Sequence, residues 1–436
     1  LSAEMKKWLG TRQSSMTPNE LIRAALKMPV DLIWNGGIGT YIKGSKENHA
    51  DCGDRANDDL RVNGNEVTAK IVGEGGNLGL TQLGRVEYAS HGGRVNTDFI
   101  DNVGGVDCSD NEVNIKILLN SLVNSGDLTT KQRNQLLYDM TDDVAELVLQ
   151  DCYRQTQSIS ITDFNGPASL KEQIRFIHGL EREGYLNREL EFIPTDDELS
   201  DRLAMGRGLT RPELSVLIAY GKMVLKEKLN VPEITNNTFH RQLLITAFPQ
   251  VLQDRFSSNM DDHPLRAEII ATKLANNMIN DMGLNFLFRM QEETGSSIAE
   301  IANAYTVVKG IYNKKGLWED IEALDNKVPS HVQLEMLIAL RRTLRRASRW
   351  YLRHGKKGDD IQSCIDFYAP AFDDLDKNLQ RYLVPEEYQQ MEAKVLELTN
   401  QKVPQDIAYH VSSLSNLFPT LDLAQVAATE SRDIAL

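Results

Sequence analysis

Three short segments near the start of the sequence combine asparagine with glycine, and each follows a candidate strand. They are Asn35-Gly36, Gly76-Asn77, and Asn102 with Gly104 and Gly105. Glycine lets a ligand approach the main chain closely, and the asparagine amide both donates and accepts hydrogen bonds, which suits a carboxamide or a ribose hydroxyl. Both residues are also common in turns that need positive φ, so a purely structural role stays open.

Ser109 adds a hydroxyl shortly after the third segment, within the run IDNVGGVDCSDNEVN at residues 100–114. We expect a helix to begin at Ser109, and a hydroxyl at a helix N-terminus can bind a carboxylate with help from the helix dipole. Glu112 lies three residues later, so Ser109 and Glu112 also have the spacing of a capping box. Both roles for the hydroxyl stay open.

The elements that must position these residues alternate between strands and helices up to about residue 120. Strands are predicted at the runs VDLIWN, AKIVGE and RVNTDFI, and helices at TPNELIRAAL, TQLGRVEYASHG and the segment that starts SDNEVN. Such alternation indicates an α/β fold with a mainly parallel sheet, half of a doubly wound domain. The asparagine and glycine segments would then line the carboxyl edge of that sheet, where ligands bind in open α/β folds.

Beyond residue 120 the sequence predicts long amphipathic helices. One of them carries apolar residues at three-and-four spacing that should face a core: Leu337, Leu340, Leu344, Ala347 and Tyr351. The predicted fold class is therefore α/β followed by mainly α. We place the division near residue 120, with residues 121–436 forming the helical region and a further boundary within 195–235.

Composition limits the classes of function. The 436 residues carry a formal net charge of −14, which argues against nucleic-acid binding, and no apolar run is long enough to span a membrane. The four cysteines lie far apart, which suits a reducing cytoplasm and signals neither a zinc site nor a disulfide framework. The first residues, LSAEMKKWLG, lack an initiator methionine, so we expect part of a longer polypeptide.

Two further groups could carry chemistry. The polar loop at residues 43–59 holds potential metal ligands, namely Glu47, His49, Asp51, Cys52 and Asp54, but their spacing fits no known site and favours a solvated loop. The basic residues of one helix are Arg341, Arg342, Arg345, Arg346, Arg349 and Arg353. We interpret them as a solvated face with acidic neighbours, with contact to an acidic partner domain as the alternative.

Two of these motifs resemble those of glutamate dehydrogenases. VGEGGNLGLTQLG is similar to the family pattern E-G-A-N-x-P-x-T, and DNVGGVDCSDNE resembles N-A-G-G-V-x-x-S-x-x-E. Large bacterial NAD-specific members contain runs very like WNGGIGTYIKGS, ADCGDRAND and GLTRPELSVLIAYGK. The chain departs from smaller members in having Gly76 for alanine and Gly79 for proline.

The resemblance implies that residues 1–120 are the C-terminal half of a Rossmann-like dinucleotide-binding domain and that the cofactor is NAD. Asn77 matches a residue beside the nicotinamide ribose, and Asn102 one near the nicotinamide and substrate. The residues expected to contact the cofactor are Asn35, Gly36, Gly76, Asn77, Asn102 and Gly104. Gly105, Val106 and Ser109 are expected at the substrate, with Ser109 binding its distal carboxylate.

By the same resemblance, the whole enzyme is an oxidoreductase of amino-acid catabolism that converts L-glutamate to 2-oxoglutarate and ammonium. No G-x-G-x-x-G turn follows a strand here, and the family's catalytic lysine and aspartate cannot be placed. We therefore expect the chain to depend on the rest of its polypeptide, to be inactive alone and to belong to a homo-oligomer. The alternatives are a dehydrogenase for an apolar amino acid, which Ser109 disfavours, and a helical regulatory or oligomerisation module without catalytic role.

Overall fold

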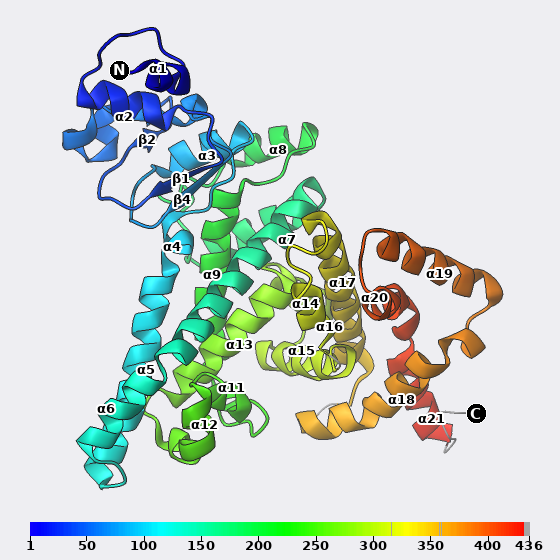
Figure 1. Ribbon diagram of the computed structural model, residues 1–436. Helices are drawn as coiled ribbons and strands as arrows, with labels where there is room; N and C mark the ends of the chain where they lie inside the picture. Colours follow the sequence, from blue (N-terminus) through cyan, green and yellow to red (C-terminus); the bar gives the residue numbers. More distant parts are fainter. Residues whose placement is uncertain (315, 357, 359, 431–436) are drawn as a thin grey trace. The chain divides into compact units, whose positions relative to one another are not determined.

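The computed structural model describes residues 1–314, 316–356, 358 and 360–430, and these residues form two compact units. Unit 1 comprises Leu1–Val224 and Ile245–Arg266, and unit 2 comprises Leu225–Leu244 and the residues from Ala267 onward. The chain is mainly helical, with small parallel sheets in unit 1 (Figure 1). These two units do not test the predicted division near residue 120 or the boundary predicted within 195–235. Both stay predictions.

Two parallel strand pairs form the sheets. β1 (Leu32–Asn35) pairs with β4 (Ile71–Glu74) in the register Asn35 to Glu74, and β2 (Ile42–Lys43) pairs with β3 (Val62–Asn63). Both strands of the first pair were predicted, and each ends at the residue before its glycine loop. One face of the pair, with Ile33 and Val72, packs on the buried core of this region.

The third predicted strand is mostly wrong. Within the run RVNTDFI, only Arg94 forms a bridge, parallel to Ile71, and the chain then enters the short helix α4 (Asp98–Asp101). The reason is local, because the Thr97 carbonyl accepts hydrogen bonds from the main chain of Ile100 and Asp101 and starts a helical turn. Arg94 thus lies next to β4, on the side away from β1, which is the order that a Rossmann-like half would have. A full third strand is missing from the described residues, so the Rossmann-like half stays a prediction.

Short helices flank these strands. They are α1 (Ala3–Leu9), α2 (Pro18–Leu26), α3 (Gln82–Ser90) and the 3-10 turns η1 (His49–Cys52), η2 (Arg55–Asn57) and η3 (Gly64–Glu66). The predicted helix of TPNELIRAAL is confirmed: Thr17 and Glu20 form a capping box, and Pro18 occupies the first turn. The predicted helix after the second glycine loop is confirmed as α3, which Thr81 caps.

Further helices complete unit 1. Those assigned mainly to it are α5 (Val103–Ser125), α6 (Thr130–Asp139), α7 (Thr141–Arg182), α8 (Asp196–Ala204), α9 (Arg211–Leu229), α12 (Gln250–Phe256) and η4 (Asn259–Asp262). α5 packs along α7, and α4 contacts both (Figure 1). Gly166 interrupts α7 with φ of 34° before Pro167, so α7 bends there.

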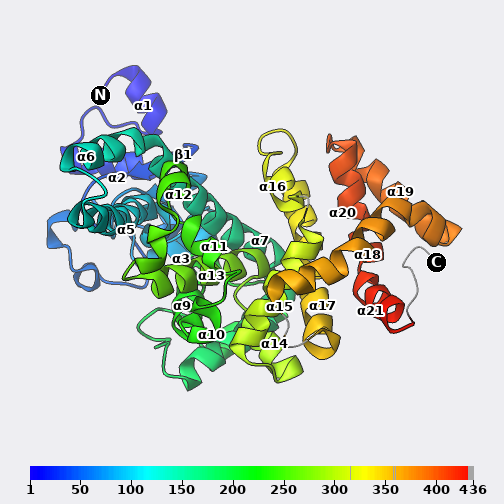
Figure 2. The same cartoon turned by 90° about the horizontal axis from the view of Figure 1, so that it is seen from below.

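All the regular secondary structure in the described part of unit 2 is helical. Its helices are α10 (Pro232–Thr235), α11 (Arg241–Ile245), α13 (Arg266–Met282), α14 (Phe286–Thr294), α15 (Ile298–Tyr312), α16 (Leu317–Glu322), α17 (Ser330–His354), α18 (Ile361–Tyr382), α19 (Pro385–Asn400), α20 (Gln405–Leu417) and α21 (Thr420–Glu430). α15 packs against α17 and α18, and α19 packs against α20 (Figure 2). The apolar stripe predicted on α17, from Leu337 to Tyr351, is buried as expected.

The basic residues of α17 are only partly as predicted. Arg341 is buried, not solvated: it donates to the carbonyl oxygens of Asp281 at 2.6 Å and Asn280 at 2.8 Å. Burial lowers the pKa of Arg341 to about 10. Arg349 pairs with Glu293, so the predicted acidic neighbour is confirmed for this residue. Arg346 instead lies over the ring of Phe418. The positive charge of Arg341 is thus stabilised by helix carbonyls that periodicity does not reveal.

Candidate functional site

The glycine loops after β1 and β4 are tied to each other by their main chains. The amides of Gly75 and Gly76 donate to the carbonyl of Asn35, at 2.8 and 3.0 Å. A Cβ on Gly76 would lie 2.8 Å from the carbonyl oxygen of Gly37, so this close approach requires glycine. The parallel pairing therefore brings the first two predicted segments together at one edge of the sheet.

Asn102 brings the third segment to the same place. Its side-chain amide donates to the Gly76 carbonyl at 3.2 Å and to the side-chain oxygen of Asn77. Asn77 is exposed and Asn102 half-buried, so a ligand can reach both carboxamides. Gly104 behaves differently: a Cβ there would meet Val148 and Cys152 of α7 at 3.7 Å, so Gly104 faces a neighbouring helix.

The predicted start of a helix at Ser109 is wrong, and so is the capping role that had stayed open for its hydroxyl. α5 begins at Val103 because the Gly105 amide already bonds to the carbonyl of Asn102, so Ser109 lies inside the helix. The Ser109 hydroxyl donates to the Gly105 carbonyl at 3.2 Å, and Glu112 pairs with Lys116 instead of capping. The helix dipole cannot assist Ser109 either, because its effect is confined to the first turn.

Ser109 nevertheless shares a helix face with two other predicted site residues. Asn102, Val106 and Ser109 are spaced by four and three residues, which places them in one row along α5. Val106 is 62% exposed, and the Ser109 side chain is also exposed. The predicted substrate residues thus form a surface row that starts at the Asn102 and Asn77 contact and extends about 10 Å along the helix.

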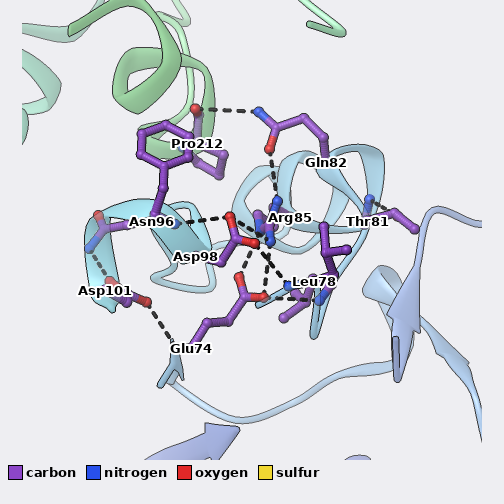
Figure 3. Close-up of polar contacts among 12 residues, drawn as sticks. Glu74, Leu78, Thr81, Gln82, Arg85, Asn96, Asp98, Asp101 and Pro212 are labelled. Atoms are coloured by element: carbon purple, nitrogen blue, oxygen red, sulfur yellow. Dashed lines mark hydrogen bonds and ion pairs between the residues drawn. The ribbon is translucent and has the colours of Figure 1, made fainter. Parts of the chain in front are cut away.

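A buried ion-pair network lies beside the loop after β4 (Figure 3). Arg85 of α3 donates to both carboxylate oxygens of Glu74, at 2.7 and 3.0 Å, and pairs with Asp98 at 3.3 Å. Glu74 is fully buried and Arg85 is 4% exposed. Burial raises the pKa of Glu74, and the guanidinium of Arg85 opposes that shift.

A second acid, Asp101 of α4, joins the network to the strand. Its carboxylate accepts from the main-chain N–H of Glu74 at 3.0 Å and from the amide of Asn96 at 2.9 Å. Asn96 in turn accepts from Arg211 at 3.1 Å. Burial raises the pKa of Asp101 and lowers the pKa of Arg211.

Sequence reasoning missed Glu74, Arg85, Asp98 and Asp101. One signal was present, because Glu74 follows the apolar run Ile71-Val72-Gly73 and a glutamate at the end of a buried strand needs a cationic partner. The identity of the partner could not be read, since Arg85 is eleven residues away on a separate helix. The aspartates were hidden by the incorrect third strand.

The polar loop at residues 43–59 is mostly exposed, as the prediction of a solvated loop implies, and the buried cation Arg61 anchors part of it. Arg61 donates to the carbonyl of Thr40 at 2.8 Å and to Asp58 at 2.7 Å, and its side chain is fully buried. Asp54 accepts from the Thr40 amide, and Glu47 accepts from Gly44 and Thr81. In the described part of the chain, no three potential ligand side chains gather around a metal position.

Comparison with known proteins shows the family. A model described as "Glutamate dehydrogenase, C-terminal" matches residues 206–436, and one described as "Bacterial NAD-glutamate dehydrogenase, catalytic domain" matches residues 1–162. The chain belongs to the bacterial NAD-glutamate dehydrogenase family. Of the residues that the structure describes, none form a helix with the length and apolar character needed to cross a bilayer.

Proteins named NAD-specific glutamate dehydrogenase are similar to nearly the whole chain. The protein of Halomonas elongata is 48% identical over 98% of this chain, that of Pseudomonas aeruginosa 45% over 100%, and that of Mycobacterium tuberculosis 39% over 97%. The aligned region is 26%, 27% and 26% of these relatives, respectively. The chain therefore spans about a quarter of the length of the curated glutamate dehydrogenases that it matches.

The structure explains one departure from the smaller glutamate dehydrogenases. A Cβ on Gly79 would lie 1.7 Å from the side-chain nitrogen of Asn35, so neither proline nor alanine fits while Asn35 keeps its position. That nitrogen is buried and has no hydrogen-bond partner within the described residues. Asn35 and Gly79 therefore form a matched pair at this edge of the sheet.

Proposed function

We propose that the chain forms one side of the active site of an enzyme that oxidatively deaminates L-glutamate to 2-oxoglutarate with NAD. The contact of Asn102 with Gly76 and Asn77 carries this proposal, because it unites both family motifs at the carboxyl edge of two parallel strands. The ligand-binding edge of open α/β sheets lies there. Family membership and the names of the relatives support the choice of reaction.

The residues at this edge fit the nicotinamide end of NAD. Two carboxamides, Asn77 and Asn102, offer donors and acceptors, and the Asn35 nitrogen is a buried donor that has no partner in the described chain. Gly36 is exposed, and the loop around Gly76 allows close approach of a ligand. When bound there, NAD would supply the acceptor for the hydride that leaves the α-carbon of glutamate.

The protein's part in this proposal is to orient the reactants. Asn77 and Asn102 would fix the nicotinamide riboside, and Val106 would lie beside the substrate's methylene groups. The Ser109 hydroxyl would turn from the Gly105 carbonyl to donate to the distal carboxylate of glutamate. Such positioning would bring the substrate α-carbon close to the hydride acceptor, the main contribution that a cofactor-dependent dehydrogenase makes.

An open face of the sheet supports the proposal that the rest of the polypeptide completes this domain. Leu32 and Trp34 lie on the same face of β1 and are 52% and 61% exposed, although parallel sheets are normally covered on both faces. β1 also pairs only with β4 among the described strands. By the family resemblance, we place the pyrophosphate turn, the catalytic lysine and the catalytic aspartate elsewhere in the polypeptide.

Two further proposals concern the cellular location and the oligomeric state. Cys52, Cys108 and Cys152 are free thiols, which supports a cytoplasmic location. A homo-oligomer is proposed on the family resemblance alone.

The test is NAD-dependent oxidation of L-glutamate, followed by NADH absorbance, by the full-length polypeptide and by this chain alone. We expect turnover by the full-length protein and none by the chain. Absence of turnover by the full-length protein would contradict the proposed activity. Turnover by the isolated chain would contradict the proposal that essential residues lie outside it and would favour a complete active site within these residues.

A further inference from the structure

The loop at residues 75–80, which carries Asn77, is held by acceptors that lie on both sides of it. The Leu78 main-chain N–H donates to a carboxylate oxygen of Asp98 at 2.8 Å, and the Leu80 N–H donates to Glu74 at 3.1 Å. Leu78 has φ of 59°, a left-handed conformation that is costly for a leucine. A strained residue persists only when the surrounding contacts impose its conformation, so these tethers contribute to the shape of the loop, together with the Thr40 hydroxyl, which donates to the Leu78 carbonyl.

One cation organises both tethers. Arg85 contacts Glu74 through two hydrogen bonds and Asp98 through an ion pair, as Figure 3 shows. Arg85 belongs to α3, whose N-terminal turn is capped by Thr81 immediately after the loop. Arg85 therefore fixes the Glu74 and Asp98 carboxylates relative to α3, and these carboxylates hold the main chain of the loop.

We propose that Glu74, Arg85 and Asp98 are positioning residues for the cofactor, acting through the loop that presents Asn77 to Asn102. This inference rests on the proposed function for the identity of the ligand. Glu74 and Arg85 are buried, so they do not touch the ligand themselves. Their effect is to keep the Asn77 carboxamide next to that of Asn102, in the arrangement that the nicotinamide riboside would require.

A purely structural role is the rival, in which the network stabilises the fold and the loop shape does not matter for binding. Asp98→Ala separates the two, because it removes the tether to Leu78 while the pair between Glu74 and Arg85 remains. Asp31→Ala is the matched control: it removes an exposed pair with Lys70 at the opposite end of the same two strands. Asp98→Asn keeps an oxygen that can accept from Leu78 and serves as the conservative variant.

The first measurement is amide hydrogen exchange of the segment that contains Leu78, in the full-length protein without NAD. Loss of one charge-assisted hydrogen bond should raise exchange at Leu78 about tenfold in Asp98→Ala and leave it unchanged in Asp31→Ala. Equal exchange in both variants would overturn the proposal, because Asp98 would then not hold the loop. This readout does not require activity.

The second measurement is steady-state kinetics of the same proteins. We expect Asp98→Ala to raise KM for NAD about tenfold, with less than a twofold change in kcat, and Asp98→Asn to lie between it and the unaltered protein. An unchanged KM for NAD, or a matching loss in Asp31→Ala, would overturn the positioning role. If the unaltered protein does not turn over NAD, the proposed function fails, whereas the exchange result still decides whether Asp98 shapes the loop.

Discussion

Asn102 donates its side-chain amide to the main-chain carbonyl of Gly76, 3.2 Å away, and thereby joins the start of α5 to the loop after β4. The same amide contacts Asn77, so one side chain connects the two family motifs. The contact is the point at which the proposed cofactor residues and the proposed substrate row of α5 meet. Its removal should therefore affect both ligands.

Asn102→Ala should raise KM for NAD and for glutamate, each by about three- to tenfold, because the loop and the helix lose their connection. The loss of stability should be only about 0.5–1.5 kcal/mol, the usual net value of one hydrogen bond. The measurement combines steady-state kinetics of the full-length protein with denaturant unfolding. Asn111→Ala is the control, since the Asn111 amide also donates to a carbonyl, that of Asp107 within α5. Equal kinetic effects of both variants would contradict a specific role for Asn102.

Gly79→Ala should destabilise the protein by about 1–3 kcal/mol, the usual range for an added group in a packed site. The new Cβ would lie 1.7 Å from the Asn35 side-chain nitrogen and 3.1 Å from Glu74, so Asn35 must leave its position. Thermal unfolding of the single variant and of the double variant Asn35→Ala with Gly79→Ala is the measurement. The double variant should regain most of the lost stability, and a simple sum of the two single effects would refute this packing account.

The sequence predicted the elements whose signals are local. β1, β4, α2 and α3 follow from apolar runs, glycine and a capping box, and the buried stripe of α17 follows from helical periodicity. Predictions failed where contacts with distant residues matter. The run after Arg94 enters a helical turn at the Thr97 carbonyl, and this turn places Asp98 and Asp101 where they accept the main-chain N–H groups of Leu78 and Glu74. Arg341 is buried because its guanidinium donates hydrogen bonds to helix carbonyl oxygens.

The candidate site was also predicted only where its signals are local. The asparagine and glycine positions were predicted from residue type, and the structure places Asn35, Gly76, Asn77 and Asn102 together, although their binding role stays a prediction. The network beneath them needs Glu74 and Arg85 from separate elements, and no spacing in the sequence pairs them. The start of α5 was misplaced because Ser109 and Glu112 imitate a capping box, whereas the helix begins at Val103.

His263 should make stability depend on pH. Its side chain is buried, with Nε2 donating to the Asn114 carbonyl of α5 and Nδ1 accepting from the Leu265 amide, both at 3.1 Å. Burial lowers the pKa of His263, because protonation of Nδ1 would break the second bond and charge a buried ring. The unfolded chain therefore binds this proton more readily than the folded one as pH falls.

The direction of the pH dependence follows from this difference in the pKa of His263 between the folded and unfolded chain. Above about pH 6.5, the ordinary histidine pKa, neither state is protonated and the stability that His263 contributes is complete. Below that pH the free energy of unfolding should fall, by at most about 1.4 kcal/mol per pH unit for one group. Denaturant unfolding from pH 8 to pH 5 should show a shallower loss in His263→Gln, while His91→Gln, at an exposed histidine, should retain the slope of the unaltered chain. His240 contributes in the same direction, because burial also lowers its pKa.

Ser109→Ala tests whether the Ser109 hydroxyl binds the substrate or only makes a hydrogen bond within α5. Ser109 lies inside α5 and its hydroxyl donates only to the Gly105 carbonyl among the described residues, so its loss removes no cap. Stability should stay within about 0.5 kcal/mol of the unaltered protein, since alanine is the better helix former. In the full-length enzyme, kcat/KM for glutamate should fall by about 10- to 150-fold, which corresponds to about 1.5–3 kcal/mol for a hydrogen bond to a charged carboxylate.

The affinity for NAD should change little in Ser109→Ala, because Asn77 and Asn102 are proposed to hold the cofactor. Ser121→Ala, a serine substitution farther along the same helix, controls for the general effect of alanine in α5. A further comparison uses a substrate analogue whose distal carboxylate is replaced by a methyl group. If Ser109 binds that carboxylate, Ser109→Ala should lower activity toward glutamate but not toward the analogue. Equal losses for both substrates would show that the hydroxyl acts on the helix or the loop and not on the substrate carboxylate.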